Sequence, residues 1–168
     1  DPYLWLSQAR NVVNHGHLGD TIEDGVSKFS LRDGRLNKVS SVQLNPYFGA
    51  YLFKFLSIFD RDITLMRAMF LLPPIIIGLA IIPAFLIGRK LSGNVGGLFA
   101  ALFLALNKPL LGRTPAGFSD TDPYNILFPL LVVWLFLEAY DTKKDILRWI
   151  YGSLAGLTVG LYATAWSG

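Results

Sequence analysis

The chain has 168 residues, of which 52% are hydrophobic and none is cysteine, and its formal net charge is +3 at pH 7. This apolar content exceeds what the core of one soluble domain needs, so the composition indicates a membrane protein. The missing cysteines exclude disulfides and thiolate metal sites, and the scattered basic residues form no motif for nucleic-acid recognition.

The first 67 residues are rich in charge and turn signals, including Asp24-Gly25, Asp33-Gly34 and Asn45-Pro46. These features predict a water-facing loop. Within it, residues 46–59 place aromatic and aliphatic side chains at helical spacing around a single lysine. This pattern predicts a helix lying in the membrane interface or, equally well, a surface helix packed on a neighbouring domain. We therefore expect an external region at 1–62 and a membrane region at 63–168.

Four apolar stretches predict four transmembrane helices, at roughly 64–90, 91–111, 123–140 and 146–166. The uncharged runs Ala68–Gly88 and Trp149–Gly168 exceed the ~18 residues that identify a spanning helix. The second and fourth stretches carry small residues every four positions, which predicts faces for close helix packing in lipid. These residues are Gly97, Ala101 and Ala105 in the second stretch, and Gly152, Gly156, Gly160 and Thr164 in the fourth.

Basic residues flank two of the short connections and predict which side of the membrane these connections face. Arg89 and Lys90 lie at one, and Lys143, Lys144 and Arg148 lie at the other. Short loops rich in lysine and arginine face the cytoplasm, so we expect both connections there. The loop at 107–122 is then external, on the same side as residues 1–62.

The external loop contains two aspartates, Asp120 and Asp122, separated by one residue. In an extended segment both carboxylates face one way, which suits a hard cation such as Mg²⁺ or Mn²⁺. Asp122 precedes Pro123, however, and an aspartate cap followed by proline is an ordinary helix start. Capping and metal binding remain equal alternatives for this residue, and it can serve both purposes.

Three further polar features bear on a site. Arg113 lies seven residues before Asp120 and fits pairing with an aspartate, neutralisation of a phosphate or anchoring near lipid headgroups. Asp1 precedes Pro2, so it fits a helix cap as well as a ligand. His15 and His17 are interpreted as a solvent-exposed loop pair rather than metal ligands.

The ordered motifs "DPYLWLSQAR", "NPYFGAYLFKFL", "RTPAGFSDTD" and "AWSG" span nearly the whole chain. Together they resemble the N-terminal half of the membrane region of the oligosaccharyltransferase catalytic subunit, a family that performs protein N-glycosylation in archaea, some bacteria and eukaryotes. The resemblance implies an all-α polytopic membrane protein with a GT-C-type glycosyltransferase architecture. It also implies a fragment of a larger chain, with a catalytic glutamate and an acceptor pocket beyond residue 168. The ending Trp166-Ser167-Gly168 differs mildly from the Trp-Gly-Gly-like turn usual in the family.

The resemblance also implies roles for individual residues. Asp1 matches an aspartate that binds the catalytic metal and touches the acceptor asparagine. Asp120 and Asp122 match further ligands of that metal, Mn²⁺ or Mg²⁺, and Arg113 matches an arginine that orients the carboxylates.

The implied reaction transfers an oligosaccharide from a polyprenyl (pyro)phosphate to the asparagine of an Asn-x-Ser/Thr sequence. The implied partners are this lipid-linked donor, the acceptor polypeptide, the bilayer and possible additional subunits, with no nucleic acid. The expected location is the plasma membrane of an archaeon or bacterium, or the endoplasmic reticulum membrane, with the active site on the external or lumenal face.

Two other function classes remain open from the residues. Another membrane glycosyltransferase that uses polyprenyl-phosphate sugars would also place acids in its first external loop, but it needs no paired acids with an upstream arginine in the second. A transporter or channel fragment would be expected to carry ionisable groups deep in its spans. The uncharged runs Ala68–Gly88 and Trp149–Gly168 argue against that class.

Overall fold

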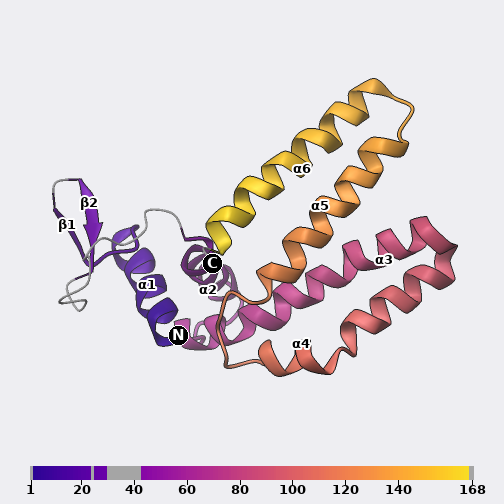
Figure 1. Cartoon of the computed structure of the whole chain (residues 1–168). Coiled ribbons are helices and arrows are strands. Elements are labelled where there is room, and N and C mark those ends of the chain that lie inside the picture. The colour runs from indigo at the N-terminus through magenta and orange to yellow at the C-terminus, as the bar shows by residue number, and fades with distance from the viewer. Residues whose placement is uncertain (1, 24, 30–42, 167–168) are drawn as a thin grey trace. The chain divides into compact units, whose positions relative to one another are not determined.

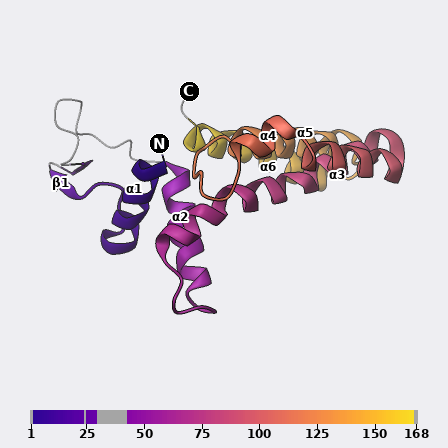
Figure 2. The same cartoon turned by 90° about the horizontal axis from the view of Figure 1, so that it is seen from below.

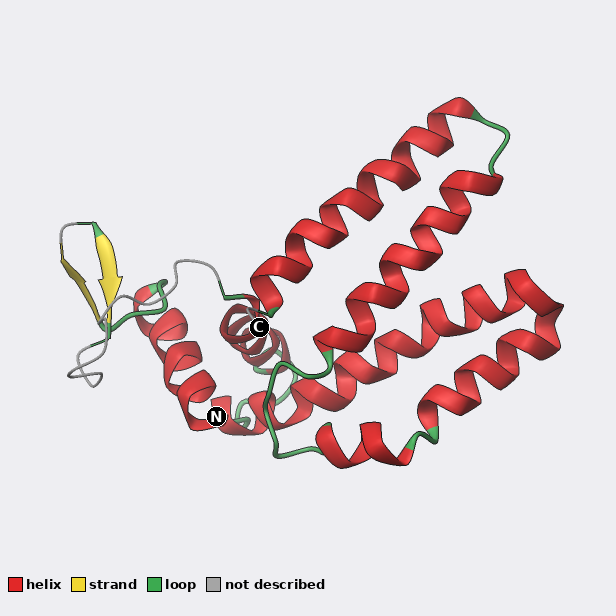
Figure 3. Cartoon of the chain, in the orientation of Figure 1, coloured by secondary structure: helices red, strands yellow, loops and turns green. Residues whose placement is uncertain are grey.

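The computed structural model describes residues 2–23, 25–29 and 43–166 (Figure 1). Its elements are α1 (Pro2–His15), β1 (Thr21–Glu23), β2 (Val26–Lys28), α2 (Leu44–Leu56), α3 (Leu65–Ala105), α4 (Lys108–Arg113), α5 (Tyr124–Asp141) and α6 (Asp145–Ala165). Helices predominate, as predicted, and the only strands among the described residues form one small hairpin (Figure 3). The chain divides into two compact units, Asp1–Leu72 with Ala116–Asp120, and Pro73–Pro115 with Thr121–Gly168.

The first unit is more ordered than the water-facing loop predicted for residues 1–67. Helices α1 and α2 pack against each other (Figure 2), and the β1–β2 hairpin pairs Ile22 with Ser27 in antiparallel register. Four buried side chains form a small core: Val12, Leu18, Phe29 and Ala50. The expectation of a loop was therefore wrong for α1 and the hairpin, because a small apolar core orders a segment that its charge content marked as irregular.

Helix α1 has recognisable signals at both ends. Pro2 occupies its first position, where a missing N–H costs no helical hydrogen bond. The helix ends before Gly16, whose φ of 80° is a left-handed conformation that favours glycine. The Gly16 N–H donates to the Val12 carbonyl at 3.1 Å and closes the last turn.

Helix α2 confirms the helix expected near residues 46–59, although it starts at Leu44 and ends at Leu56. Its buried side includes Gly49, where an added Cβ atom would overlap the Met69 sulfur. Tyr51 and Phe55 are exposed on the helix, and Phe59 is exposed in the turn that follows. The exposed aromatic side is compatible with both the interfacial and the packed-surface alternatives.

Helix α3 consists of two helical halves joined by a sharp reversal at Ser92 and Gly93 (Figure 1). Gly93 has a φ of 71°, which permits the reversal at little steric cost. The halves touch through glycine: a Cβ on Gly88 would lie 2.6 Å from the Gly96 carbonyl oxygen. This helical hairpin lies where the sequence predicts the boundary between its first two spans.

The start of α3 is capped by Thr64, whose hydroxyl oxygen accepts a hydrogen bond from the Arg67 N–H at 3.3 Å. The start and the reversal of α3 both fall within two residues of the sequence prediction. Helix α3 ends at Ala105, earlier than the expected 111, because Asn107 caps the separate short helix α4.

Helices α5 and α6 form a second hairpin and run side by side in the second unit (Figure 1). At the end where α5 finishes, Lys90 of α3 pairs with Glu138 at 3.1 Å and with Asp141 at 3.0 Å. These ion pairs bring the connections near residues 90 and 142 to the same end of the unit. That arrangement agrees with placing both basic connections on one side of a membrane.

Two helices of the described chain, α3 and α5, are long and apolar enough to cross a membrane. Only 39% and 28% of their most apolar windows are buried in the chain, so they are not enclosed like the core helices of a soluble protein. Helix α6 matches the fourth expected span in position but does not meet the same criterion. The sequence prediction of four spans therefore stays a prediction.

Candidate functional site

The segment around the paired aspartates begins with α4. The Asn107 side chain accepts a hydrogen bond from the Leu110 N–H at 3.1 Å and starts this helix. The Thr114 hydroxyl donates to the Leu110 carbonyl at 2.8 Å and helps to end it. Arg113 is the last residue of α4 and its side chain is exposed. The expected external loop is thus partly helical, and α4 fixes the backbone that carries Arg113.

Residues 116–120 belong to the first unit. The Gly117 N–H donates to the Phe70 carbonyl at 3.2 Å, and Gly117 has a φ of 102° that favours glycine. Ser119 is 1% exposed, and its hydroxyl has no hydrogen-bond partner among the described residues. The residue directly before Asp120 is therefore a buried polar group, which the sequence analysis did not single out.

Asp122 lies at the start of α5, in the second unit. The helix is capped by Pro123 without a side-chain hydrogen bond, and the Asp122 carbonyl accepts from the Asn125 N–H at 3.0 Å. The alternative that Asp122 caps the helix through its carboxylate is therefore wrong. Its carboxylate instead faces Arg113, with 3.9 Å between Asp122 Oδ2 and Arg113 Nη1.

Near the start of α5, Asn125 bonds to a tyrosine of α6 that the sequence analysis did not single out. The Tyr162 hydroxyl donates to Asn125 Oδ1 at 3.0 Å. Ring contacts continue from Tyr124 through Phe128 and Tyr162 to Trp166. The aromatic spacing at 124 and 128, and at 162 and 166, is a helical i,i+4 pattern that signals two aromatic faces, but not that they meet.

The other predicted site residues have different outcomes. Asp1 lies outside the described residues. Asp120 is half-buried in the first unit, and the boundary between the units falls directly after it. His15 is exposed, and the His17 ring contacts the Ser27 hydroxyl at 3.4 Å. Within the described ranges, no three histidine, aspartate or glutamate side chains form a metal cluster.

Comparison with known proteins gives consistent matches. The model of the family described as "Oligosaccharyl transferase STT3, N-terminal" matches residues 1–168. The dolichyl-phosphooligosaccharide-protein glycotransferase of Methanococcus voltae is 34% identical over 99% of this chain and 19% of its own length. The similarly named protein of Methanocaldococcus jannaschii is 28% identical over 86% of this chain and 16% of its own.

A eukaryotic relative also matches: the stt3 subunit of the dolichyl-diphosphooligosaccharide–protein glycosyltransferase of Schizosaccharomyces pombe is 25% identical over 70% of this chain and 15% of its own length. No solved structure matches the chain. The chain spans about a fifth or less of the length of these relatives.

Proposed function

Because the chain belongs to the STT3 family of oligosaccharyl transferases, as its N-terminal region, we propose that the full-length protein transfers an oligosaccharide from a polyprenyl phosphate or pyrophosphate to asparagine in Asn-x-Ser/Thr sequences. The family match over residues 1–168 is the observation that carries this proposal. It confirms the resemblance based on the four motifs and assigns the chain to a family of enzymes. The names of the archaeal relatives, dolichyl-phosphooligosaccharide-protein glycotransferases, support a lipid donor and a protein acceptor.

The proposed metal ligands are Asp1, Asp120 and Asp122, and the proposed ion is Mg²⁺ or Mn²⁺. Carboxylate oxygens are the ligands that such hard cations prefer. The carboxylate of Asp122 is not used to cap α5, and its contact with Arg113 is long, so it fits this role. When bound, the cation would supply Lewis-acid stabilisation of the departing phosphate.

Arg113 is proposed to orient the Asp122 carboxylate. An ion pair of 3.9 Å with a 78% exposed arginine contributes only about 0–1 kcal/mol to stability. Such a weak contact can bias where the carboxylate points without occupying both of its oxygens. Arg113 would therefore act as a positioning residue for Asp122.

Asp1 is proposed to engage the amide of the acceptor asparagine, together with a glutamate that the family carries beyond residue 168. The new bond joins the amide nitrogen to the anomeric carbon, and the bond from that carbon to the phosphate oxygen breaks with inversion. The phosphate leaves with the bonding electron pair, and the amide loses a proton to the carboxylates that hold it. An amide nitrogen is a poor nucleophile, so holding both substrates in place removes part of the barrier.

The proposed site faces the external or lumenal side of an archaeal, bacterial or endoplasmic reticulum membrane. Additional subunits are proposed as partners, because the Schizosaccharomyces relative is named as a subunit of its enzyme.

The test is a transfer assay with the full-length protein, a lipid-linked oligosaccharide and a labelled Asn-x-Thr peptide. The peptide mass should increase by the mass of the glycan, and transfer should need Mn²⁺ or Mg²⁺ and stop with a chelator. A peptide with glutamine in place of asparagine should stay unmodified. Equal transfer to the glutamine peptide, or modification of a lipid or hydroxyl acceptor instead, would contradict the proposal.

A further inference from the structure

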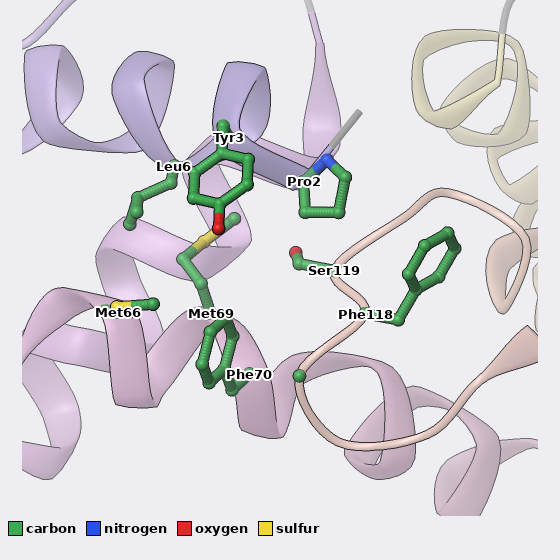
Figure 4. Close-up of a pocket in the computed structure, with 9 residues that line it drawn as sticks. Pro2, Tyr3, Leu6, Met66, Met69, Phe70, Phe118 and Ser119 are labelled. Carbon is green, nitrogen blue, oxygen red and sulfur yellow. The ribbon is translucent and has the colours of Figure 1, made fainter.

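The first unit contains a cavity of about 350 Å³, which is within the ~300–1,000 Å³ range of small-ligand pockets. Its walls come from Tyr3 and Leu6 of α1, Met69 and Phe70 of α3, and Phe118 and Ser119 of the loop before Asp120 (Figure 4). Among the described residues, no charged side chain lines it. The cavity therefore suits a neutral apolar group, and its size admits a short piece of chain rather than a long one.

Two polar side chains among the described residues, those of Tyr3 and Ser119, interrupt the apolar wall. The Ser119 hydroxyl points from its loop into the cavity, toward the side where Pro2 and Tyr3 lie (Figure 4). It is buried and has no hydrogen-bond partner among the described residues. A buried hydroxyl without a partner is destabilising, and in native proteins it calls for an explanation such as a missing ligand. The cavity thus combines a mostly apolar lining with the Ser119 hydroxyl, a donor that a ligand can satisfy.

We propose that this cavity receives the isoprene unit nearest the phosphate of the lipid donor, and that the Ser119 hydroxyl donates to the oxygen joining that unit to the phosphate. The proposal rests on the proposed function. An isoprenyl phosphate presents a hydrogen-bond acceptor directly at the head of an apolar chain, which matches the two features of the cavity. The donor class also matches the dolichyl lipid named in the archaeal relatives.

The position of the cavity supports the same occupant. Met69 and Phe70 lie in the second turn of α3, near the start of a helix apolar enough to cross a membrane. The start of such a helix lies near the headgroups, where the phosphate of a membrane lipid also lies. Ser119 directly precedes Asp120, which is proposed to hold the metal on that phosphate. The flexible side chain of Met69 can adapt to a branched isoprene unit.

An acceptor polypeptide fits the cavity less well. Peptide backbone entering the cavity would bring several donors and acceptors into a wall whose described polar side chains are only Tyr3 and Ser119. Buried polar groups without partners are unfavourable. An apolar acceptor side chain alone would leave the Ser119 hydroxyl without a partner. We therefore assign the cavity to the lipid and treat the peptide as the competing outcome of the test.

The kinetic test compares Ser119→Ala with Ser57→Ala in the full-length protein. Ser57 is a matched control, because its exposed hydroxyl donates to the Lys54 carbonyl in the same unit. Ser119→Ala should raise the KM for the lipid donor by about tenfold or more, as expected for a lost hydrogen bond to a charged group. The peptide KM should stay unchanged, and the unfolding temperature should not fall, because the change removes an unpaired buried hydroxyl. Ser57→Ala should change neither KM.

A raised peptide KM with an unchanged donor KM would overturn the proposal and assign the cavity to the acceptor. A lower unfolding temperature with both KM values unchanged would also overturn it, because Ser119 would then be only structural.

A binding measurement separates this proposal from the proposed function. Geranylgeranyl phosphate is titrated into the detergent-solubilised full-length protein by calorimetry, with inorganic phosphate as a competitor and a chelator present to remove the metal that would otherwise hold phosphate. Binding should be at least about tenfold weaker in Ser119→Ala than in the unmodified protein, and inorganic phosphate should not compete. This result would support the cavity assignment even if no peptide were glycosylated. Equal affinity of both proteins for geranylgeranyl phosphate, together with normal peptide transfer, would overturn the cavity assignment and leave the proposed function intact. Competition by inorganic phosphate would also overturn the cavity assignment.

Discussion

Asp120 and Asp122 differ in their surroundings although only one residue separates them. Asp120 follows the buried Ser119 in the first unit. Asp122 lies two residues before α5 in the second unit, and its carboxylate faces Arg113. The Asp122 carboxylate does not cap α5, and its ion pair with Arg113 is long and weak. Metal binding by this carboxylate therefore stays a proposal.

The metal proposal predicts that Asp120→Asn and Asp122→Asn each weaken Mn²⁺ binding by at least about tenfold in the full-length protein, because each removes a charged ligand. The unfolding temperature of Asp122→Asn without metal should change little, since Asp122 makes no capping bond. Calorimetric titration with Mn²⁺ measures the affinity. Asp60→Asn is the charge-matched control, because Asp60 is exposed and bonds only locally to the Asp62 N–H. Unchanged Mn²⁺ affinity in both variants would remove the pair from the site.

The hydrogen bond from Tyr162 to Asn125 joins α6 to the start of α5, one turn after Asp122. Tyr162→Phe keeps the ring contacts with Phe128 and Trp166 but leaves the Asn125 oxygen without this donor. We expect a loss of about 0.5–1.5 kcal/mol in the free energy of unfolding. Denaturant unfolding in detergent measures it, with Tyr140→Phe at a 78% exposed site as the control. Equal stability of the two variants would show that the bond does not join the helices.

At the scale of elements, the positions of the long helices were predictable from the sequence. Apolar length alone places the starts of α3, α5 and α6 within two residues of the expected ranges. The helix start at Asp1-Pro2 was one of two alternatives in the sequence, but the charge and turn signals of residues 1–67 favoured a loop. The core that Val12 of α1 joins includes Phe29 and Ala50, which are distant in sequence. Local pattern shows where a segment is apolar but not which distant segment covers it.

The same limit applies to the small residues. Gly97 packs closely in the α3 hairpin, since a Cβ there would lie 2.9 Å from the Phe85 carbonyl oxygen. The corresponding series in α6, Gly152, Gly156 and Gly160, has no atom within 4 Å of an added Cβ in the described chain. Spacing identified both series as possible packing faces, but only the fold reveals which one has a neighbour. In the candidate site, sequence spacing was enough to single out Asp120, Asp122 and Arg113. Ser119 and Tyr162 could be recognised only from their burial and contacts in the fold.

The α3 hairpin gives a direct test of close packing. In Gly88→Ala the new Cβ would lie 2.6 Å from the Gly96 carbonyl oxygen and 2.7 Å from the Ala100 Cβ. The halves must then separate, and we expect a cost of about 1–3 kcal/mol in the free energy of unfolding. Gly78→Ala in the same helix is the matched control, because its Cβ would meet nothing within 4 Å. It should be neutral or stabilising by up to about 1 kcal/mol, since alanine favours helix. Equal thermal stability of Gly88→Ala and Gly78→Ala in detergent would contradict close packing of the two halves of α3.

At the scale of the whole molecule, the proposed site requires residues 1–62 and the loop at 107–122 to face the same side of the membrane. Lys90 pairs with Glu138 and Asp141 at one end of the second unit, while Arg113 and Asp122 belong to a connection between its spans. Basic residues in the connections at 89–93 and 142–144 favour the cytoplasm for that end. The site would then be external or lumenal.

Cysteine labelling tests this topology in the full-length protein, in a background where any other cysteines have been replaced. Thr21→Cys and Ala116→Cys occupy exposed positions in the two proposed external segments, and Lys143→Cys is exposed in the proposed cytoplasmic connection. Ser119 is unsuitable because it is buried, so a reagent would fail to reach it from either side. In right-side-out vesicles an impermeant thiol reagent should label the first two sites and spare Lys143→Cys until the membrane is permeabilised. Protection of only one of Thr21→Cys and Ala116→Cys would place Asp120 and the first external segment on opposite sides, and a shared metal site would then be impossible.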